Sequence, residues 1–350
     1  MVCPICSSIY TDQIKYINCE SFDDSFLYKN ITVRKCESCG HIFNSLTKKE
    51  LQNLVKYYKD EYAPSNLSKI DISGDLPGAI NPANFRRYKC VLSIIEPYIR
   101  KNSKILDIGC AMGGFLSYLK LLGYKNLYGI EPIQAYVDEA KKDKDIVVKK
   151  GSVYYNPFED NSFDIVILDQ VLEHLSDLRL AMKQIKRVLR KGGLCYIGVP
   201  DVERYNDNIY WYLMREHIQH FSVVDLKRLA QLNGFELIKA FQNENSMIGT
   251  LKLQNLSVVL KVSSKVYCWG IGREFMHSYV NTRLKNLDLI LIDDTPKKQQ
   301  QTFKGKTIFP SSILKDAESD SFLIITAKVH RKYLEKKAID LGYKGEIISV

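Results

Sequence analysis

The feature that most constrains the fold is a regular alternation of apolar runs and amphipathic stretches after residue 100. "KILDIGC", "NLYGIE", "DIVVKKG", "SFDIVILDQ" and "GGLCYIGVP" are typical of buried strands. Between them, "GGFLSYLKLLG", "PIQAYVDEAKK" and "DLRLAMKQIKRVLRKGG" predict helices, the last one ending at its glycines. Strands that alternate with helices indicate an α/β fold, in which a parallel sheet carries helices on both faces. Ligands of such sheets bind at the carboxyl ends of the strands.

A glycine turn with acidic residues follows the first of these strands. The stretch "DIGCAMGG" contains Gly109 and Gly113 after Asp107, and Glu131 closes the next strand 24 residues later. A carboxylate at that second position is suited to accept both hydroxyls of a ribose. The turn lacks a full G-x-G-x-x-G, and Asp107 would repel a pyrophosphate, so NAD does not fit. S-adenosylmethionine (SAM) carries an ammonium and a sulfonium and no phosphate, which suits this turn. Taken singly, the glycines are also explained by turn formation.

The ordered set "ILDIGCAMGGFL", "YGIEP", "NSFDIVILDQVLEHLSD" and "RVLRKGGLCYIGVP" resembles the consecutive motifs of class I SAM-dependent methyltransferases over about residues 100–240. The resemblance implies a Rossmann-like SAM-binding domain. It places Glu131 on the ribose, and Ser152 stands where many relatives carry an acid beside the adenine. The full set of cofactor-binding residues that it implies is Asp107, Gly109, Cys110, Gly113, Glu131, Pro132, Ser152, Asp169 and Gln170.

Four of the nine cysteines form two C-x-x-C pairs, Cys3 with Cys6 and Cys36 with Cys39, on either side of residues 7–35. Two such pairs can close one tetrahedral thiolate site, and four protein ligands leave no open position, so we expect a structural zinc ion. A disulfide or a chance pairing is the alternative. His41 follows the second pair and is expected to be a bystander. The other cysteines are single and lie mostly in apolar surroundings, which is typical of a reducing compartment.

The last hundred residues predict a second, smaller α/β unit. "KVYCWGIG", "LDLILIDD" and "FLIITA" are typical of strands, while "REFMHSYV" and "RKYLEKKAIDLGY" are typical of helices. The "GIG" turn and Asp293 give a weak dinucleotide signal. We favour a substrate site or a purely structural role for this unit.

The combination of a two-pair cysteine module, a SAM domain and a Rossmann-like tail with "DDTPKKQQQTFKGKTIFP" resembles the three-domain nucleotide-sugar C-methyltransferases. That resemblance implies a nucleotide-sugar substrate between the SAM and C-terminal domains, and it matches Tyr62 to an active-site tyrosine. The expected division is a zinc module (1–45), a helical bridge over the active site (46–99), a SAM domain (100–250) and a C-terminal domain (251–350).

The stretch "YLMREHIQHFS" falls where this family carries a tyrosine and then His-Glu-His. Glu216 and His217 match, and the resemblance makes His217 the base, while Arg215 and Met214 replace the first histidine and the tyrosine. His174, in "VLEHLSD", matches another active-site histidine. With part of the enolate-stabilising set replaced, we favour a sugar hydroxyl over a sugar carbon as the acceptor.

Arg215 is a candidate to pair with a substrate phosphate. His220 is expected to pack or cap before a helix that Ser222 begins. A metal ion on His217 and His220 is the weaker alternative for that histidine, since no third ligand is evident nearby.

Composition excludes several function classes. No apolar run approaches the roughly 20 residues of a membrane helix, and "MVCPICSSIY" lacks a secretory pattern, so we expect a cytoplasmic protein without a membrane partner. The net charge is +10, but the Lys and Arg are scattered, so we expect no nucleic-acid partner. We expect a monomer or a weak oligomer. The rival hypotheses are a non-catalytic SAM-binding protein and a nucleic-acid methyltransferase.

Overall fold

The computed structural model describes residues 2–19, 27–58, 82–205, 208, 210–248, 251–262, 265–319 and 321–349. Contacts within the chain divide it into two compact units, 1–262 and 263–350. The expected zinc module, bridge and SAM domain therefore lie within one unit. The expected boundary at 250/251 falls twelve residues too early, because β11 (Leu251–Val262) pairs with β8 (Leu189–Pro200) in the central sheet of the first unit.

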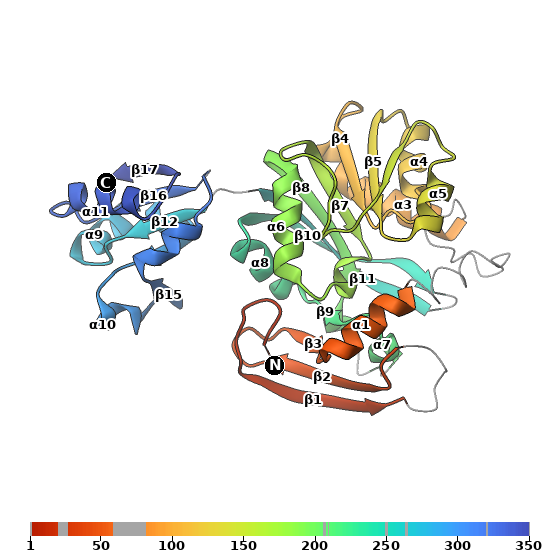
Figure 1. Ribbon diagram of the computed structural model, residues 1–350, viewed down its shortest axis with the longest axis horizontal. Coiled ribbons are helices and arrows are strands. Elements are labelled where there is room, and N and C mark those ends of the chain that lie inside the picture. The colour runs from red at the N-terminus through yellow and green to blue at the C-terminus, as the bar shows by residue number, and fades with distance from the viewer. Residues whose placement is uncertain are drawn as a thin grey trace. The chain divides into compact units, whose positions relative to one another are not determined.

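That central sheet has seven strands in the order β10-β11-β8-β7-β4-β5-β6 (Figure 1). β11 pairs antiparallel with β8 and β10, and the other pairs are parallel. The chain starts at β4 in the middle, continues outward through β5 and β6, and then returns to β7 on the other side. The carboxyl ends of β4 and β7 thus flank the point where the strand order reverses, which is where open α/β sheets bind ligands. The remaining bounds are β4 (Lys104–Ile108), β5 (Asn126–Glu131), β6 (Val147–Lys150), β7 (Phe163–Asp169) and β10 (Phe235–Ile248).

The two faces of this sheet have separate apolar cores because side chains alternate along each strand. Ile105, Ile165 and Ile167 face the helices α3 (Pro82–Ile95), α4 (Gly114–Leu121) and α5 (Gln134–Ala140). Leu106, Val166 and Leu168 face α6 (Leu178–Val188) and α8 (Val223–Leu232). The expectation of a parallel α/β sheet covered on both sides is confirmed for β4 to β8, whereas β11 is added by antiparallel pairing to β8 and β10. The helix expected to run into the glycines at 192–193 ends earlier, at Val188, and β8 begins with the next residue.

A second, four-stranded sheet in the same unit has the order β1-β2-β3-β9. β1 (Thr11–Asn18), β2 (Asn30–Cys36) and β3 (Ile42–Asn44) come from the N-terminal segment, whereas β9 (Gln219–His220) comes from the methyltransferase-like segment 175 residues later. β3 and β9 are antiparallel, with Ile42 opposite His220. The N-terminal segment is therefore joined by backbone pairing to the stretch that carries the candidate base.

The expected helical bridge contributes α1 (Lys48–Tyr57) and α3. Tyr62 lies outside the described residues. A short helix, α7 (Tyr210–Leu213), precedes the His217 segment. No helix in the described ranges is both long and apolar enough to cross a lipid bilayer.

The second unit is an α/β unit with a six-stranded sheet in the order β14-β15-β13-β12-β16-β17. Its pairs are parallel except for β14 with β15. Asp293 follows β13, and its Oδ2 accepts hydrogen bonds from the N–H of Ile271 in the "GIG" turn and from Lys298 Nζ. Within the described residues Asp293 thus ties the turn to its neighbours, which suits a structural role. The bounds are β12 (Val266–Trp269), β13 (Leu289–Ile292), β14 (Thr302–Phe303), β15 (Lys306–Phe309), β16 (Phe322–Ile325), β17 (Glu346–Ser349), α9 (Arg273–Asn281), α10 (Pro296–Gln299) and α11 (Arg331–Asp340).

Candidate active site

The glycine turn after β4 has a backbone that requires its glycines. Gly109 and Gly113 have φ values of 75° and 77°, in the left-handed region that favours glycine. A Cβ on Gly109 would lie 2.7 Å from Val171 Cγ2, and one on Gly113 would lie 2.9 Å from Ile146 Cδ1. The turn can therefore pass close to its neighbours and still expose its backbone to a ligand at the strand ends.

Asp107 and Glu131 are two buried acids at the ends of neighbouring strands, with exposed fractions of 6% and 4%. Burial raises the pKa of Asp107 to about 8, with Asp169 adding to the effect and Arg87 opposing it. Burial raises the pKa of Glu131 to about 7, although two backbone N–H groups oppose it. Those groups belong to Ile133 and Ala111, each 3.0 Å from one oxygen of Glu131. Each oxygen keeps a further lone pair that can accept a ribose hydroxyl.

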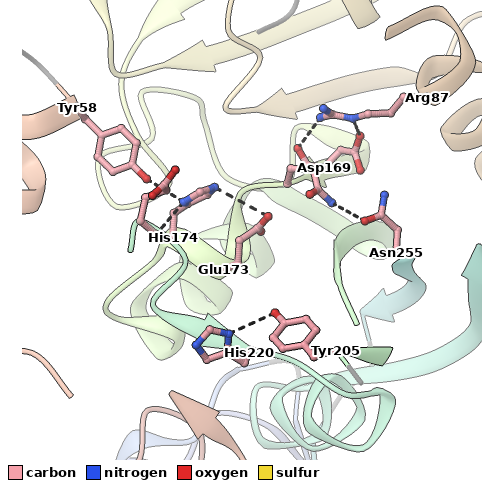
Figure 2. A network of polar contacts seen from close by, with 10 residues as sticks. Tyr58, Arg87, Asp169, Glu173, His174, Tyr205, His220 and Asn255 are labelled. Atoms are coloured by element: carbon pink, nitrogen blue, oxygen red, sulfur yellow. Dashed lines mark hydrogen bonds and ion pairs between the residues drawn. The ribbon is translucent and has the colours of Figure 1, made fainter. Parts of the chain in front are cut away.

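Asp169, at the end of β7, forms an ion pair with Arg87 of α3, with 2.5 Å between Oδ2 and Nε. Arg87 Nη2 also donates to the Asp169 carbonyl oxygen at 3.1 Å. Gln170 follows with a φ of 59°, and its side-chain amide points to Asn255 at 3.5 Å. Figure 2 shows Arg87, Asp169 and Asn255 near one another. Asp169 and Gln170 thus lie at the same end of the sheet as Asp107, where the parallel strands have their carboxyl ends.

The remaining expected cofactor residues are Cys110, Pro132 and Ser152, and their side chains are not part of the group of acids described above. The side chain of Cys110 is 4% exposed and packs towards Gly129 of β5, so that only its backbone is available to a ligand. Pro132 is exposed immediately after Glu131. Ser152 lies just beyond β6, where its Oγ accepts a hydrogen bond from Tyr155 N.

A group of three side chains lies just beyond the carboxyl end of β7. Glu173 and His174 come from the turn after β7, and His217 comes from the segment before β9. The rings of His174 and His217 are edge to face, with centroids 4.8 Å apart. Burial lowers the pKa of His174 to about 4 and that of His217 well below its usual range, so both imidazoles are neutral at physiological pH. Burial also raises the pKa of Glu173 to about 8. Figure 2 shows His174 between Tyr58 and Glu173.

Backbone hydrogen bonds hold the two segments of this group together. The N–H of Ile218 donates to the carbonyl of Glu173 at 2.9 Å, and Asn44 Nδ2 donates to the carbonyl of His217 at 3.2 Å. His174 Nδ1 lies 3.0 Å from the carbonyl oxygen of Glu216 and 2.8 Å from the Tyr58 hydroxyl. These bonds therefore hold His217 next to His174, and Glu216 contacts His174 through its backbone.

His220 and Ser222 have structural surroundings. His220 is fully buried, and its two ring nitrogens contact the Tyr205 hydroxyl and Asn44 Oδ1. Ser222 is the N-cap of α8 and forms a capping box with Asp225, which confirms that expectation. The alternative of a metal ion on His217 and His220 does not fit, because both ring nitrogens of His220 are engaged. The potential ligand atoms that lie close to His217 belong to Glu173 and His174.

The expectation that Arg215 pairs with a substrate phosphate is wrong for this structure. Its side chain is 3% exposed, and its Nη1 donates to the carbonyl of Tyr28 in the N-terminal segment. Tyr28 in turn donates its hydroxyl to the Arg215 carbonyl at 2.6 Å. The guanidinium fastens the two segments to each other.

The four paired cysteines converge. Cys3 Sγ and Cys39 Sγ are 3.6 Å apart, Cys6 Sγ and Cys36 Sγ are 3.5 Å apart, and all four sulfurs lie within 4.8 Å of one another. Zinc–sulfur bonds of about 2.3 Å in a tetrahedron place the sulfurs about 3.8 Å apart. The donor set and its spacing therefore fit a zinc ion. His41 is outside this group and contacts Gln219 and Asp225 instead.

Three residues of this region were not predicted from the sequence: Arg87, Tyr58 and Glu173. Glu173 directly precedes His174 in "VLEHLSD", and an acid beside a histidine at a strand end was an available signal. Arg87 and Tyr58 come from helices with ordinary polar surfaces, and nothing in their own segments marks them.

Comparison with known proteins gives a consistent assignment. Residues 83–240 match a family model described as a methyltransferase domain. An uncharacterized methyltransferase of Schizosaccharomyces pombe is 38% identical over 126 residues, which cover 32% of this chain and 45% of that protein. The ubiquinone biosynthesis O-methyltransferase of Pelagibacter ubique is 27% identical, with 44% of this chain and 65% of that protein covered.

A solved structure of a SAM-dependent methyltransferase from Methanosarcina mazei aligns at a TM-score of 0.44 with 18% identity, covering 49% of this chain and 97% of that one. The chain spans less than half the length of the S. pombe relative. The match to the family model coincides with the sheet, the glycine turn and the buried acids described above. Residues 83–240 form a class I SAM-dependent methyltransferase domain.

Proposed function

We propose that the protein transfers a methyl group from SAM to a hydroxyl of a nucleotide-activated sugar. The observation that carries the proposal is the contact between two imidazoles, His174 and His217, whose ring centroids lie 4.8 Å apart just beyond the carboxyl end of β7. A neutral imidazole can take a proton from a hydroxyl as it attacks. The sugar assignment rests on the resemblance to three-domain nucleotide-sugar enzymes, which the converging cysteines and the second α/β unit support.

The residues present fit SAM. Glu131 would hold the ribose hydroxyls on its remaining lone pairs, and Asp107 would be the partner of the amino acid ammonium. The crowding of Gly109 against the side chain of Val171 explains why this position of the turn admits no side chain. Bound SAM supplies a methyl group on a sulfonium leaving group. The chain itself aligns the acceptor with that group, which is the main requirement of an in-line displacement.

Within this proposal His217 accepts the hydroxyl proton, and His174 lines the pocket and is oriented by the Glu216 carbonyl. Glu216 acts as a positioning residue through this contact. Transfer to a sugar carbon beside a ketone is the second candidate, because Glu216 and His217 retain the residues of the C-methylating relatives.

We further propose that Cys3, Cys6, Cys36 and Cys39 bind one structural zinc ion. Their spacing supports it, and four thiolates leave no coordination position for a substrate.

The test of the proposed activity uses ¹³C-methyl SAM and a panel of sugar nucleotides, with mass spectrometry to find the methylated product. A methoxy carbon shift in the product supports the hydroxyl acceptor, whereas a carbon-bound methyl shift selects the second candidate. Absence of turnover with every sugar nucleotide would contradict the proposal, and methylation of RNA or DNA would replace it. His217→Ala should lose about 10²–10⁴ in kcat while SAM binding persists. His277→Ala, on an exposed surface of α9, is the control that should keep full activity.

A further inference from the structure

We propose that Glu173, His174 and His217 bind a divalent transition-metal ion, and that this ion binds the acceptor oxygen during methyl transfer. The ion site stands on the geometry of these three residues alone, whereas its role in the reaction rests on the proposed function. It differs from the cysteine site in donor type, in position in the chain, and in leaving coordination positions open.

The spacing of the three side chains fits a shared ion. Each offers one ligand atom, and these atoms all lie within 4.8 Å of one another. His174 Nε2 and Glu173 Oε1 are 3.9 Å apart, which is too long for a hydrogen bond. Ligand atoms about 2.1 Å from one ion lie about 3–3.5 Å from each other. A small closing movement of the side chains therefore completes the site.

Unpartnered buried atoms point to a missing cation. Glu173 is 1% exposed, and within the described ranges neither of its carboxylate oxygens has a hydrogen-bond partner. His217 is 6% exposed, and its Nδ1 is also without a partner there. A buried carboxyl group without a hydrogen bond is costly, and coordination of a metal ion is one of the arrangements that satisfies such a group. The nearby guanidinium of Arg87 is engaged by Asp169.

The contacts of His174 fix its ring in a ligand orientation. The Glu216 carbonyl oxygen, 3.0 Å from Nδ1, can only accept, and the Tyr58 hydroxyl, 2.8 Å from the same nitrogen, can also accept. A proton on Nδ1 therefore satisfies both contacts. The lone pair of His174 is then on Nε2, which is the nitrogen near Glu173. Histidines that bind metals almost always donate their other N–H to a carbonyl or carboxylate in this way. The Ile218–Glu173 backbone bond keeps the third ligand, His217, at the same place.

Two imidazoles and one carboxylate favour Mn²⁺, Fe²⁺, Co²⁺ or Zn²⁺ over Mg²⁺ or Ca²⁺, and they leave positions for acceptor oxygens. An acceptor hydroxyl bound there loses its proton to water more readily. Its oxygen then forms a bond to the methyl carbon while the carbon–sulfur bond breaks, and that electron pair leaves the neutral thioether of S-adenosylhomocysteine. One proton is released for each methyl group transferred. This role replaces the one given to His217 in the proposed function: with the ion bound, His217 is a ligand. The hydroxyl proton then goes to water, and His217 serves as the base only in protein without the ion.

Manganese binding to the purified full chain tests the site, because thiolates select zinc and carboxylate–imidazole sets accept Mn²⁺. Electron paramagnetic resonance of free Mn²⁺ during titration should show one bound ion per chain. Glu173→Gln, which keeps the side-chain shape, and His217→Ala should each weaken that binding at least tenfold. The exposed controls Glu203→Gln and His277→Ala should bind as the wild type does. SAM calorimetry checks that each variant is folded, and His174→Gln replaces any variant that is not.

Two results overturn the inference. One is a wild-type chain that takes up neither Mn²⁺ nor Co²⁺, and no zinc beyond the cysteine site, at millimolar concentrations. The other is unchanged Mn²⁺ binding in the folded ligand variants. Activity separates this inference from the proposed function. Full methyl transfer after mild chelation, with one zinc retained per chain, refutes the catalytic role of the ion and leaves the activity standing. Site-specific Mn²⁺ binding without any methylated sugar nucleotide supports the ion site and refutes the proposed function.

Discussion

Glu131 is held by two backbone N–H groups and is buried, so its orientation is fixed before any ligand arrives. Replacing it with Gln keeps the shape and removes the charge that accepts the ribose hydroxyls. We expect Glu131→Gln to lose about 1.5–3 kcal/mol of SAM binding, or roughly tenfold to a hundredfold in affinity. Calorimetry measures the loss. The exposed Asp138→Asn on α5 is the control, and equal affinity in both variants would place the ribose elsewhere.

The raised pKa values of Asp107 and Glu131 predict a pH dependence of SAM binding. Burial raises these pKa values to about 8 and about 7, so both acids bind protons near neutral pH before SAM arrives. SAM needs the carboxylate forms, and binding must therefore release protons. Affinity should rise from pH 6 to pH 9, by up to about tenfold per unit for each proton released. Glu131→Gln should remove the step near pH 7 and keep the one near pH 8. A flat profile in the wild type would contradict this assignment.

The same acids affect stability in the opposite direction. Their folded-state pKa values lie above the unfolded ones, so their contribution to stability is present below about pH 4 and is lost as the pH rises through 7 to 8. SAM-free protein is expected to melt at lower temperature at pH 8.5 than at pH 6 on account of these groups. Saturating SAM should reduce that difference, because it binds the ionised forms.

At the residue level, sequence predicts best where backbone geometry dictates the residue type. Gly109 and Gly113 adopt left-handed conformations, so the glycine pattern directly reported the turn. Arg215 was assigned to a phosphate from its chemistry alone, and its side chain is instead buried against Tyr28. Arginine is compatible with both roles, and only the long-range contact decides between them.

Among the elements, the alternating apolar runs predicted β4, β5, β7, α4 and α6 because each is continuous in sequence. The hairpin of β10 and β11 was not predicted. The polar letters "NENS" interrupt its pattern, and the strands belong to the sheet through antiparallel pairing with β8. β9 was missed for a related reason, since its two residues form a strand only by pairing with β3 from the other end of the unit. Local sequence patterns do not show which distant segment a strand will pair with.

Asn44 at the end of β3 links this short strand to the histidine segment. It donates to Tyr28 Oη and to the His217 carbonyl, and it accepts from His220 Nε2. Asn44→Ala leaves these buried groups unpaired, which should cost about 1–3 kcal/mol of unfolding free energy. Because His217 loses an anchor, kcat should fall while SAM affinity is kept. The exposed Asn102→Ala should change neither quantity, and a stability loss in Asn44→Ala without a change in kcat would show that the link is purely structural.

For the whole first unit, the paired cysteines and the helices α6 and α8 of the central sheet share one apolar core. Cys3, Ile5, Cys36 and Phe43 are buried in the same cluster as side chains of α6 and α8. The four-stranded sheet then passes from β2 and β3 into β9. A change at the sulfurs therefore has a continuous route of packed side chains and backbone bonds to His217.

Zinc removal should consequently lower the rate of methyl transfer although none of the candidate catalytic side chains is altered. We expect one zinc per chain by metal analysis, and we expect Cys3→Ser with Cys36→Ser to lose it, while Cys90→Ser retains it. Since structural zinc contributes folding energy directly, the double variant should melt at a clearly lower temperature. Loss of order in β3 and β9 should lower kcat and Mn²⁺ binding at Glu173, His174 and His217 more than SAM affinity, because Glu131 and Asp107 lie on the central sheet.

Zinc content near zero in the wild type, or full retention in the double variant, would refute the cysteine site. Zinc loss with unchanged kcat would show instead that β9 keeps its place without the metal.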